Sequence, residues 1–190
     1  MKEIIGYIAV SLVFIAYVPY IKDLLKGKTI PHVYSWFVWS FLTLLIAFMQ
    51  IKNGAGVAGG VTLSAGIVSL FVFAYALYKR ESLKFITKLD TFFLSISLVA
   101  FLLWLLIDNE LYALLLASFT EVIAFVPTIR KSWNLPYTET LSLYGLNTIR
   151  FVLAVFAIEK YSIITTLYPV TWAIGNGLFA FMLIYRRRKI

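Results

Sequence analysis

The stretches "IAYVPYIK" (residues 15–22) and "IAFVPTIR" (residues 123–130) are two versions of one eight-residue phrase. Five positions are identical, and the Tyr/Phe and Lys/Arg differences keep the chemistry of the side chain. The two copies begin 108 residues apart in a chain of 190 residues. A proline-containing phrase that occurs twice in so short a chain indicates an internal repeat.

The composition of the chain is that of a membrane protein. Hydrophobic residues make up 62% of the sequence and charged residues only 14%, whereas a soluble domain carries about 25% charged residues. Apolar runs long enough to cross a bilayer predict membrane helices. We predict seven such helices, at about residues 3–21, 33–51, 57–78, 91–107, 111–129, 140–158 and 161–185.

Basic residues are distributed unequally between the two sides of the predicted helix array. One side holds Lys2, Lys52 and Lys160, and Arg150 lies inside a helix. The other thirteen of the 17 basic residues share the opposite side: Lys22, Lys26, Lys28, Lys79, Arg80, Lys84, Lys88, Arg130, Lys131, Arg186, Arg187, Arg188 and Lys189. This bias predicts an N-terminus outside and a C-terminus in the cytoplasm. We expect the net charge of +8 to face anionic lipid and not nucleic acid.

The repeat extends beyond the opening phrase. At an offset of 107 or 108 residues, "ALYKR" (76–80) matches "LIYRR" (183–187), and Ser35 matches Ser142. Three helices in each copy would leave the copies pointing in opposite directions, and the helix at 91–107 restores a common direction. We therefore predict an all-α membrane protein built as 3+1+3: a first repeat (1–80), a linker helix with its loops (81–110) and a second repeat (111–190).

The 3+1+3 plan, the outside N-terminus and the proline near the end of the first helix of each repeat resemble the PQ-loop or SWEET superfamily. That superfamily includes SWEET sugar facilitators, half-size SemiSWEETs, lysosomal amino-acid exporters, vitamin transporters and the KDEL receptors. Two departures are visible: the family dipeptide Pro-Gln is PY at 19–20 and PT at 127–128, and Pro31 and Pro136 precede the place where SWEETs carry a second proline. The resemblance implies the fold more directly than it implies sugar as the substrate.

The repeated prolines are candidates for a hinge or gate. Each lacks an N–H and would loosen the helix at the carbonyl four residues earlier, Ile15 for Pro19 and Ile123 for Pro127. Both lie about one turn from the predicted cytoplasmic boundary, where an inner gate would bend. A static kink explains the same residues, and the sequence leaves both readings open.

Two charged residues are expected near the middle of the bilayer. Glu121 and Arg150 each lie about ten residues into a predicted helix, a depth of roughly 15 Å at 1.5 Å per residue. Because their helices are consecutive and antiparallel, we predict a direct pair. Binding a charged substrate group, accepting a proton in a coupled cycle and holding the two helices together as a structural ion pair remain alternatives.

Four further residues complete the candidate substrate site. SWEET-like proteins have an asparagine on the third helix of each repeat, facing the cavity, and the resemblance assigns that role to Asn176, with Ser69 at the matching position of the first repeat. Trp172 precedes Asn176 by one turn, and Asn147 precedes Arg150 by one turn, so each pair can share a face. Interhelical hydrogen bonding and packing are the structural alternatives.

Other conspicuous residues indicate no site. We predict that Tyr34, Trp36, Trp39 and Trp133 form an aromatic belt at the cytoplasmic interface. His32 is the only histidine, is expected at a loop edge, and cannot build a metal site alone. The chain has no cysteine, so no thiolate metal site is expected.

The predicted function is transport of a small polar solute by alternating access between the two three-helix units. The solute is a sugar or a carboxylate-bearing metabolite or amino acid. The alternative is a receptor of the KDEL-receptor type, which binds a carboxylate without translocating it. We expect no enzymatic activity, because no nucleophile has a base at plausible spacing, and no cofactor. The expected location is the plasma (inner) membrane of a prokaryote, in contact with lipid; proton coupling and homo-oligomerisation stay open.

Overall fold

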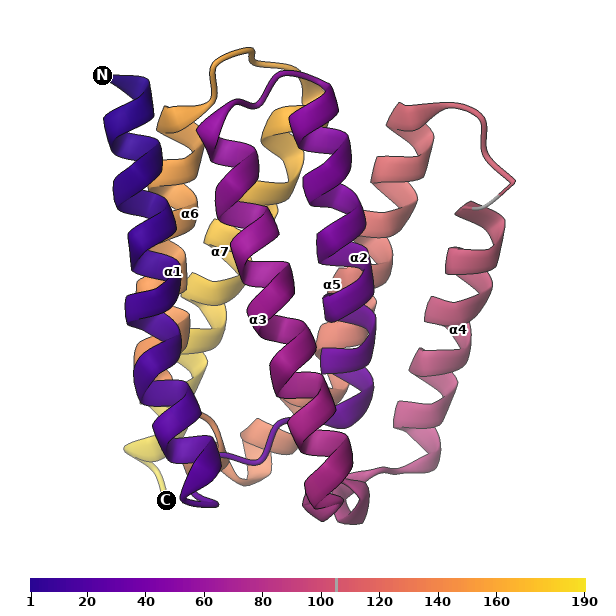
Figure 1. The fold of residues 1–190 in the computed structure, drawn as a ribbon. Helices are drawn as coiled ribbons and strands as arrows, with labels where there is room; N and C mark the ends of the chain where they lie inside the picture. The colour runs from indigo at the N-terminus through magenta and orange to yellow at the C-terminus, as the bar shows by residue number, and fades with distance from the viewer. Residues whose placement is uncertain (105) are drawn as a thin grey trace.

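The protein is a bundle of seven α-helices (Figure 1). The computed structural model describes every residue except 105, and every side chain except those at positions 100, 101, 104 and 105. No strand occurs in the described residues. The helices and two short 3₁₀ turns are α1 (Lys2–Leu25), α2 (Val33–Lys52), α3 (Val57–Lys79), η1 (Glu81–Phe85), α4 (Lys88–Trp104), α5 (Glu110–Asn134), η2 (Pro136–Thr138), α6 (Leu141–Ala157) and α7 (Ile163–Arg187).

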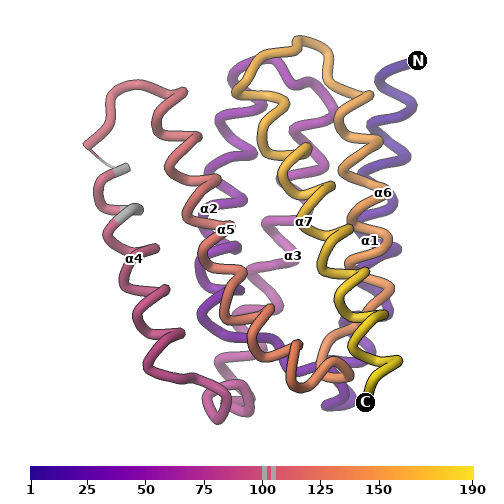
Figure 2. Tube along the Cα trace, turned by 180° about the vertical axis from the view of Figure 1, so that it is seen from behind, coloured from indigo at the N-terminus to yellow at the C-terminus, as the bar shows by residue number. Residues whose placement is uncertain are grey.

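Successive helices run in alternating directions, so the two termini lie at opposite ends of the bundle (Figures 1 and 2). We call these ends the N-terminal face and the C-terminal face. Five helices, α1, α2, α3, α5 and α7, are long and apolar enough to cross a membrane, while α4 and α6 have 17 residues each. These lengths and compositions support an integral membrane protein. The predicted helix at 91–107 includes residue 105, so its last turn lies outside the described residues.

Helix ends follow recognisable capping chemistry. The Asn109 side chain accepts hydrogen bonds from the amides of Leu111 and Tyr112 at the start of α5. Ser162 and Thr165 form a reciprocal capping box at the start of α7. These polar caps satisfy amide groups that helix geometry leaves without an intrahelical partner.

The repeated prolines do not end their helices. The sequence placed the ends of these helices near residues 21 and 129, but α1 continues past Pro19 to Leu25 and α5 continues past Pro127 to Asn134. A proline removes one intrahelical hydrogen bond, and the bonds on either side remain. The turns after each proline therefore stay helical and carry Lys22 and Lys131 to the C-terminal face.

Helix neighbours are not simply those consecutive in sequence. Helix α3 packs against both α1 and α2, and α7 packs against both α5 and α6. These two groups meet where α1 contacts α6 and where α2 contacts α5. Helix α4 lies at the edge of the bundle, against α5 and α2 (Figure 2). Helix α7 therefore lies between α5 and α6, although α5 and α6 are consecutive in the sequence.

The predicted aromatic belt is wrong for its two central tryptophans. Trp36 and Trp39 are 2% and 8% exposed and belong to the core of the bundle, whereas Trp133 is 46% exposed at the C-terminal face. Tyr34 is half-buried. Trp36 and Trp39 lie one turn apart on the face of α2 that points inward, so their rings fill the space between helices.

Candidate functional site

A small cavity lies in the middle of the bundle. Its volume is about 50 Å³, enough for one or two water molecules. Residues of six helices line it: Tyr17, Trp36, Trp39, Thr43, Ala65, Ser69, Phe125, Leu143, Tyr144, Asn147, Arg150, Phe151, Tyr168, Trp172 and Asn176. The wall is therefore mainly aromatic, with a few polar groups at defined places; this lining, and not the small volume, is typical of a ligand site.

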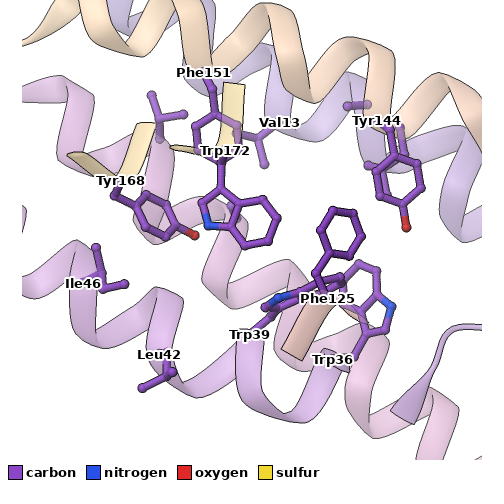
Figure 3. Packing of buried hydrophobic residues seen from close by; sticks show 14 of the residues in the cluster. Val13, Trp36, Trp39, Leu42, Ile46, Phe125, Tyr144, Phe151, Tyr168 and Trp172 are labelled. Carbon is purple, nitrogen blue, oxygen red and sulfur yellow. The ribbon is translucent and has the colours of Figure 1, made fainter. Parts of the chain in front are cut away.

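Aromatic rings from three helices meet on one side of the cavity (Figure 3). The centroid of the Trp39 ring lies 5.6 Å from that of Trp172 and 5.2 Å from that of Phe125. The rings of Phe125 and Trp172 are 5.5 Å apart. Edge-to-face and tilted contacts of this kind add about 0.5–1.5 kcal/mol per pair beyond burial. They fix the positions of the large side chains that face the cavity.

Arg150 is the charged group of the cavity. Its side chain is 2% exposed, and its Nε donates a hydrogen bond of 2.7 Å to Asn147 Oδ1. The guanidinium lies over the ring of Phe151, with 4.0 Å between its central carbon and the ring centroid. Nη1 is buried and has no hydrogen-bond partner among the described residues. A buried donor without a partner costs free energy, more so when it is charged.

A chain of amides continues from Arg150 across the cavity. Asn147 Nδ2 lies 3.4 Å from Asn176 Oδ1, and Asn176 Nδ2 donates to the backbone oxygen of Trp172 at 2.7 Å. These contacts join α6 to α7 and hold the Arg150 side chain in one orientation. On the opposite wall, the hydroxyls of Tyr17 and Ser69 are 3.3 Å apart.

Glu121 is fully buried beside the cavity and does not line it. Its Oε1 accepts a hydrogen bond of 2.8 Å from Thr43, and its Oε2 accepts one of 2.9 Å from the Trp172 indole. The Tyr168 hydroxyl lies 3.0 Å from Thr43 Oγ1. Glu121 therefore joins α5 to α2 and α7, and it anchors the tryptophan that faces the cavity.

The predicted direct pair of Glu121 and Arg150 is not formed. The ion pairs among the described residues do not include either side chain. The reason is helix order, because α7 packs between α5 and α6, while α5 meets α2. Helices that are consecutive and antiparallel in the sequence need not be neighbours in the bundle.

Five of the six predicted substrate-binding residues border one cavity: Ser69, Asn147, Arg150, Trp172 and Asn176. Sequence reasoning missed four hydroxyl-bearing members of the site, Tyr17, Thr43, Tyr144 and Tyr168. Thr43 carried a usable signal, since it is the approximate repeat counterpart of Arg150. The three tyrosines carried none, because a tyrosine in an apolar run gives no indication of which way it faces.

The cavity is closed toward the N-terminal face. The loop after α2 meets the loop after α6, where the Lys160 amide donates to the Gly54 oxygen at 3.2 Å. Gln50 Nε2 lies 3.4 Å from the Thr165 oxygen, and both side chains are buried. A small apolar cluster packs at the same end: Ala55, Ala58, Ala157 and Ile158.

The closure toward the C-terminal face is ionic. Lys131 and Glu139 form a salt bridge of 2.7 Å and are 2% and 1% exposed. Lys131 Nζ also donates to the Ile30 oxygen, in the loop between α1 and α2. The other Glu139 oxygen accepts from the hydroxyl of Tyr144, a residue of the cavity wall, at 2.9 Å. This network therefore ties the C-terminal closure to the cavity.

His32 lies at a loop edge, as predicted. It is the N-cap residue of α2 and is fully buried, and its Nε2 lies 3.4 Å from Asp90 Oδ2. Asp90 is itself bound by Arg130, which joins α4 to α5. Burial lowers the pKa of His32 to about 4; Lys131 and Arg130 act in the same direction, and Asp90 opposes them. His32 is thus neutral in the folded protein near pH 6.

Stability should therefore fall as the pH drops from about 6.5 toward about 4. Over this range His32 is protonated in the unfolded chain, where its pKa is ordinary, and stays neutral in the folded chain, where its pKa is about 4. Protonation therefore favours the unfolded chain. We expect His32→Gln to flatten this part of the stability profile and to leave the value at pH 8 nearly unchanged, as measured by unfolding titrations at a series of pH values. An equal slope in both proteins would contradict the assignment to His32.

Comparisons with known proteins do not identify a relative: no family model, no curated protein and no solved structure matches this chain. Among the described residues, no group of three or more histidine, cysteine, aspartate or glutamate side chains could hold a metal ion.

Proposed function

We propose that this protein is a membrane transporter for a small carboxylate-bearing solute. The observation that carries the proposal is Arg150, which lines the cavity and whose buried Nη1 has no hydrogen-bond partner among the described residues. A carboxylate is the natural ligand for a guanidinium edge, because it accepts charge-assisted hydrogen bonds. Asn147 and Asn176 would then bind a second polar group of the solute, and the aromatic rings would enclose its apolar part.

The helix contacts support the 3+1+3 repeat that underlies the proposal. If α1, α2 and α3 are exchanged with α5, α6 and α7, each observed contact among these six helices becomes another observed one. Thus α1 with α6 becomes α5 with α2, and α2 with α3 becomes α6 with α7. The cavity then lies between the two units, where a SWEET-like transporter would bind its solute.

The two closures support alternating access. Backbone hydrogen bonds join loops of the two units at both ends of the bundle, from Lys160 to Gly54 at the N-terminal face and from Ile30 to Thr138 at the C-terminal face. Opening one end while the other stays closed would expose the cavity to one side of the membrane at a time. We propose that the structure represents the occluded state of this cycle. Its cavity of about 50 Å³ would widen to admit a solute.

We propose that the C-terminal face is cytoplasmic, on the strength of the basic residues at that face. The absence of cysteine makes the test direct. In intact cells, an impermeant thiol reagent should label Lys2→Cys and should not label Lys189→Cys until the membrane is permeabilised. The reverse pattern would invert the orientation.

The prolines provide a test of motion at the C-terminal closure. Pro19→Ala and Pro127→Ala each restore a helical hydrogen bond, and proline costs about 3 kcal/mol more than alanine inside a helix. If the helices bend there during transport, both variants should be at least as stable as the wild type and should transport several-fold more slowly. Wild-type flux in both variants would identify static kinks.

The function is tested by binding and flux on the same preparation. Purified protein would be screened by thermal shift against amino acids, organic acids, their amides and sugars, and the best ligand would then be assayed in proteoliposomes. We expect stabilisation by a carboxylate and not by its amide, and saturable flux of that carboxylate. A sugar that stabilises and moves while carboxylates do neither would overturn the choice of solute.

A receptor of the KDEL-receptor type is the second candidate, and the same cavity supports it. Arg150 would hold a carboxylate in either case, so binding alone does not separate the two functions. Binding without flux in proteoliposomes would favour the receptor. A role for Glu121 in proton coupling is tested in the same vesicles, where Glu121→Gln should remove the pH dependence of the flux.

A further inference from the structure

A second cavity, separate from the central one, is lined by residues at the C-terminal ends of α1 and α3. Both of these helix ends lie at the C-terminal face (Figure 1). The volume of this cavity is about 230 Å³, below the roughly 300–1,000 Å³ of a typical site for a whole metabolite. Its wall includes the polar and charged residues Lys26, Tyr75, Lys79, Glu81 and Ser82.

Two cations from different elements border this groove. Lys26 follows the last turn of α1, and Lys79 ends α3. The ion pairs within the described part of the chain include neither lysine. The Lys79 ammonium lies 5.8 Å from the centroid of the Tyr75 ring. Glu81 is the one acidic residue of the wall, so two positive charges face one negative charge.

The floor of the groove offers a free hydroxyl. Ser82 is 2% exposed, and its Oγ has no hydrogen-bond partner among the described residues. A buried hydroxyl without a partner is unusual in proteins and costs free energy. An acceptor bound in the groove would remove that cost.

The second unit supplies a contrast. In the "YRR" segment that matches "YKR" at 78–80, Arg186 donates to the Trp133 oxygen and Arg187 donates to the Pro136 oxygen. The basic side chains at that end are thus bound to carbonyl groups of the protein itself. The side chains of Lys26 and Lys79 form no such hydrogen bond and no ion pair with the described residues. A groove lies between them.

The groove lies at the level expected for lipid headgroups. Tyr78 is 79% exposed and Tyr75 is half-buried, and tyrosines on the outside of a membrane protein favour the headgroup region. Leu25 is 58% exposed next to the groove, on the side that would meet acyl chains. Lipid phosphate would therefore reach the lysines from the membrane, without leaving its own layer.

We propose that this groove binds the phosphate group of an anionic lipid. Lys26 and Lys79 supply the positive charge, and the Ser82 hydroxyl donates a hydrogen bond to a phosphate oxygen. Glu81 on the rim weakens the site. Because the loop from Lys26 to Pro31 also carries the Ile30 oxygen that Lys131 binds, an occupied groove would hold the C-terminal closure in place.

The test measures retained lipid and stability on the full-length protein. The protein in phosphatidylcholine nanodiscs would be compared with protein in discs that also contain phosphatidylglycerol, and native mass spectrometry would count the phosphatidylglycerol retained. We expect retained phosphatidylglycerol and a higher unfolding temperature. Lys26→Gln combined with Lys79→Gln should weaken retention about 25-fold, at about fivefold for each lysine near an anionic lipid surface.

Matched variants separate a site from general surface charge. Lys84→Gln with Lys88→Gln removes the same charge from the same face, outside the groove, and should change retention less than twofold. Ser82→Ala should weaken retention several-fold without lowering stability in phosphatidylcholine, and Glu81→Gln should strengthen retention. Equal losses in the two double lysine variants, or no retained phosphatidylglycerol, would overturn the proposal. If inorganic phosphate alone raised the unfolding temperature as much as phosphatidylglycerol does, the groove would be a site for free phosphate, and the proposal of a lipid ligand would be overturned.

Discussion

Replacing Arg150 with glutamine should weaken carboxylate binding by about 30-fold or more, while leaving the ligand-free protein at least as stable as the wild type. Removing one partner of a buried charged contact costs about 2–5 kcal/mol in binding. In the ligand-free protein the same change removes a buried guanidinium whose Nη1 has no partner in the described chain, so the cost of burying that charge is removed with it. Thermal shift with and without the carboxylate measures both quantities.

The opposite signs of these two effects distinguish a binding residue from a structural one. If Arg150 only held α6 in place, Arg150→Gln would lose stability together with binding. Arg150→Lys is the matched control, because it keeps the charge and loses the planar pair of donors; we expect intermediate affinity. Since Glu121 binds Thr43 and Trp172 and not Arg150, adding Glu121→Gln should not rescue Arg150→Gln. If Glu121→Gln did rescue Arg150→Gln, the result would support the direct Glu121–Arg150 pair that the sequence predicted.

Replacing Lys131 with methionine should lower the free energy of unfolding by about 3–5 kcal/mol, the cost of leaving one member of a buried ion pair alone. Glu139 is 1% exposed, and its remaining contact from Tyr144 is a neutral donor that does not replace the lysine charge. The double variant Lys131→Met/Glu139→Gln should recover most of the loss, because no charge is then left buried. Unfolding titrations in mixed detergent micelles measure all three proteins.

An exposed ion pair on the opposite face provides the control. The side chains of Lys52 and Glu110 form a salt bridge but are 61% and 37% exposed, and exposed pairs contribute about 0–1 kcal/mol. Lys52→Met should therefore change stability by less than 1 kcal/mol. If Lys131→Met were as mild as Lys52→Met, the Lys131–Glu139 contact would not hold the C-terminal closure.

Much of the helical framework could be predicted from sequence. The seven predicted apolar runs correspond to the seven helices, with ends that differ by a few residues. This works because a bilayer imposes a span length and denies the backbone any partner outside the helix. Glu121 and Arg150 could be selected as candidates for the same reason, since charged side chains in apolar runs are costly and few. Asn147 was selected by its spacing from Arg150, and Asn176 by the resemblance to SWEET-like proteins.

The partners of those polar residues were decided by tertiary structure alone. The sequence order of helices suggested that Glu121 meets Arg150, and only the packing of α7 between α5 and α6 assigned Glu121 to Thr43 and Trp172. Which neighbour a helix finds depends on side chains from distant parts of the chain. That information is not local in the sequence.

Tertiary structure also decided which aromatic side chains point into the bundle and which point outward. Within α2, Trp36 and Trp39 are buried, whereas Phe41 and Phe48 are 49% and 67% exposed. In a soluble protein hydrophobic periodicity would have separated the two faces. In a membrane both the lipid and the protein interior accept apolar side chains. The sequence therefore determines that α2 is a helix of a membrane protein, and only packing against α5 and α7 decides which of its rings border the cavity.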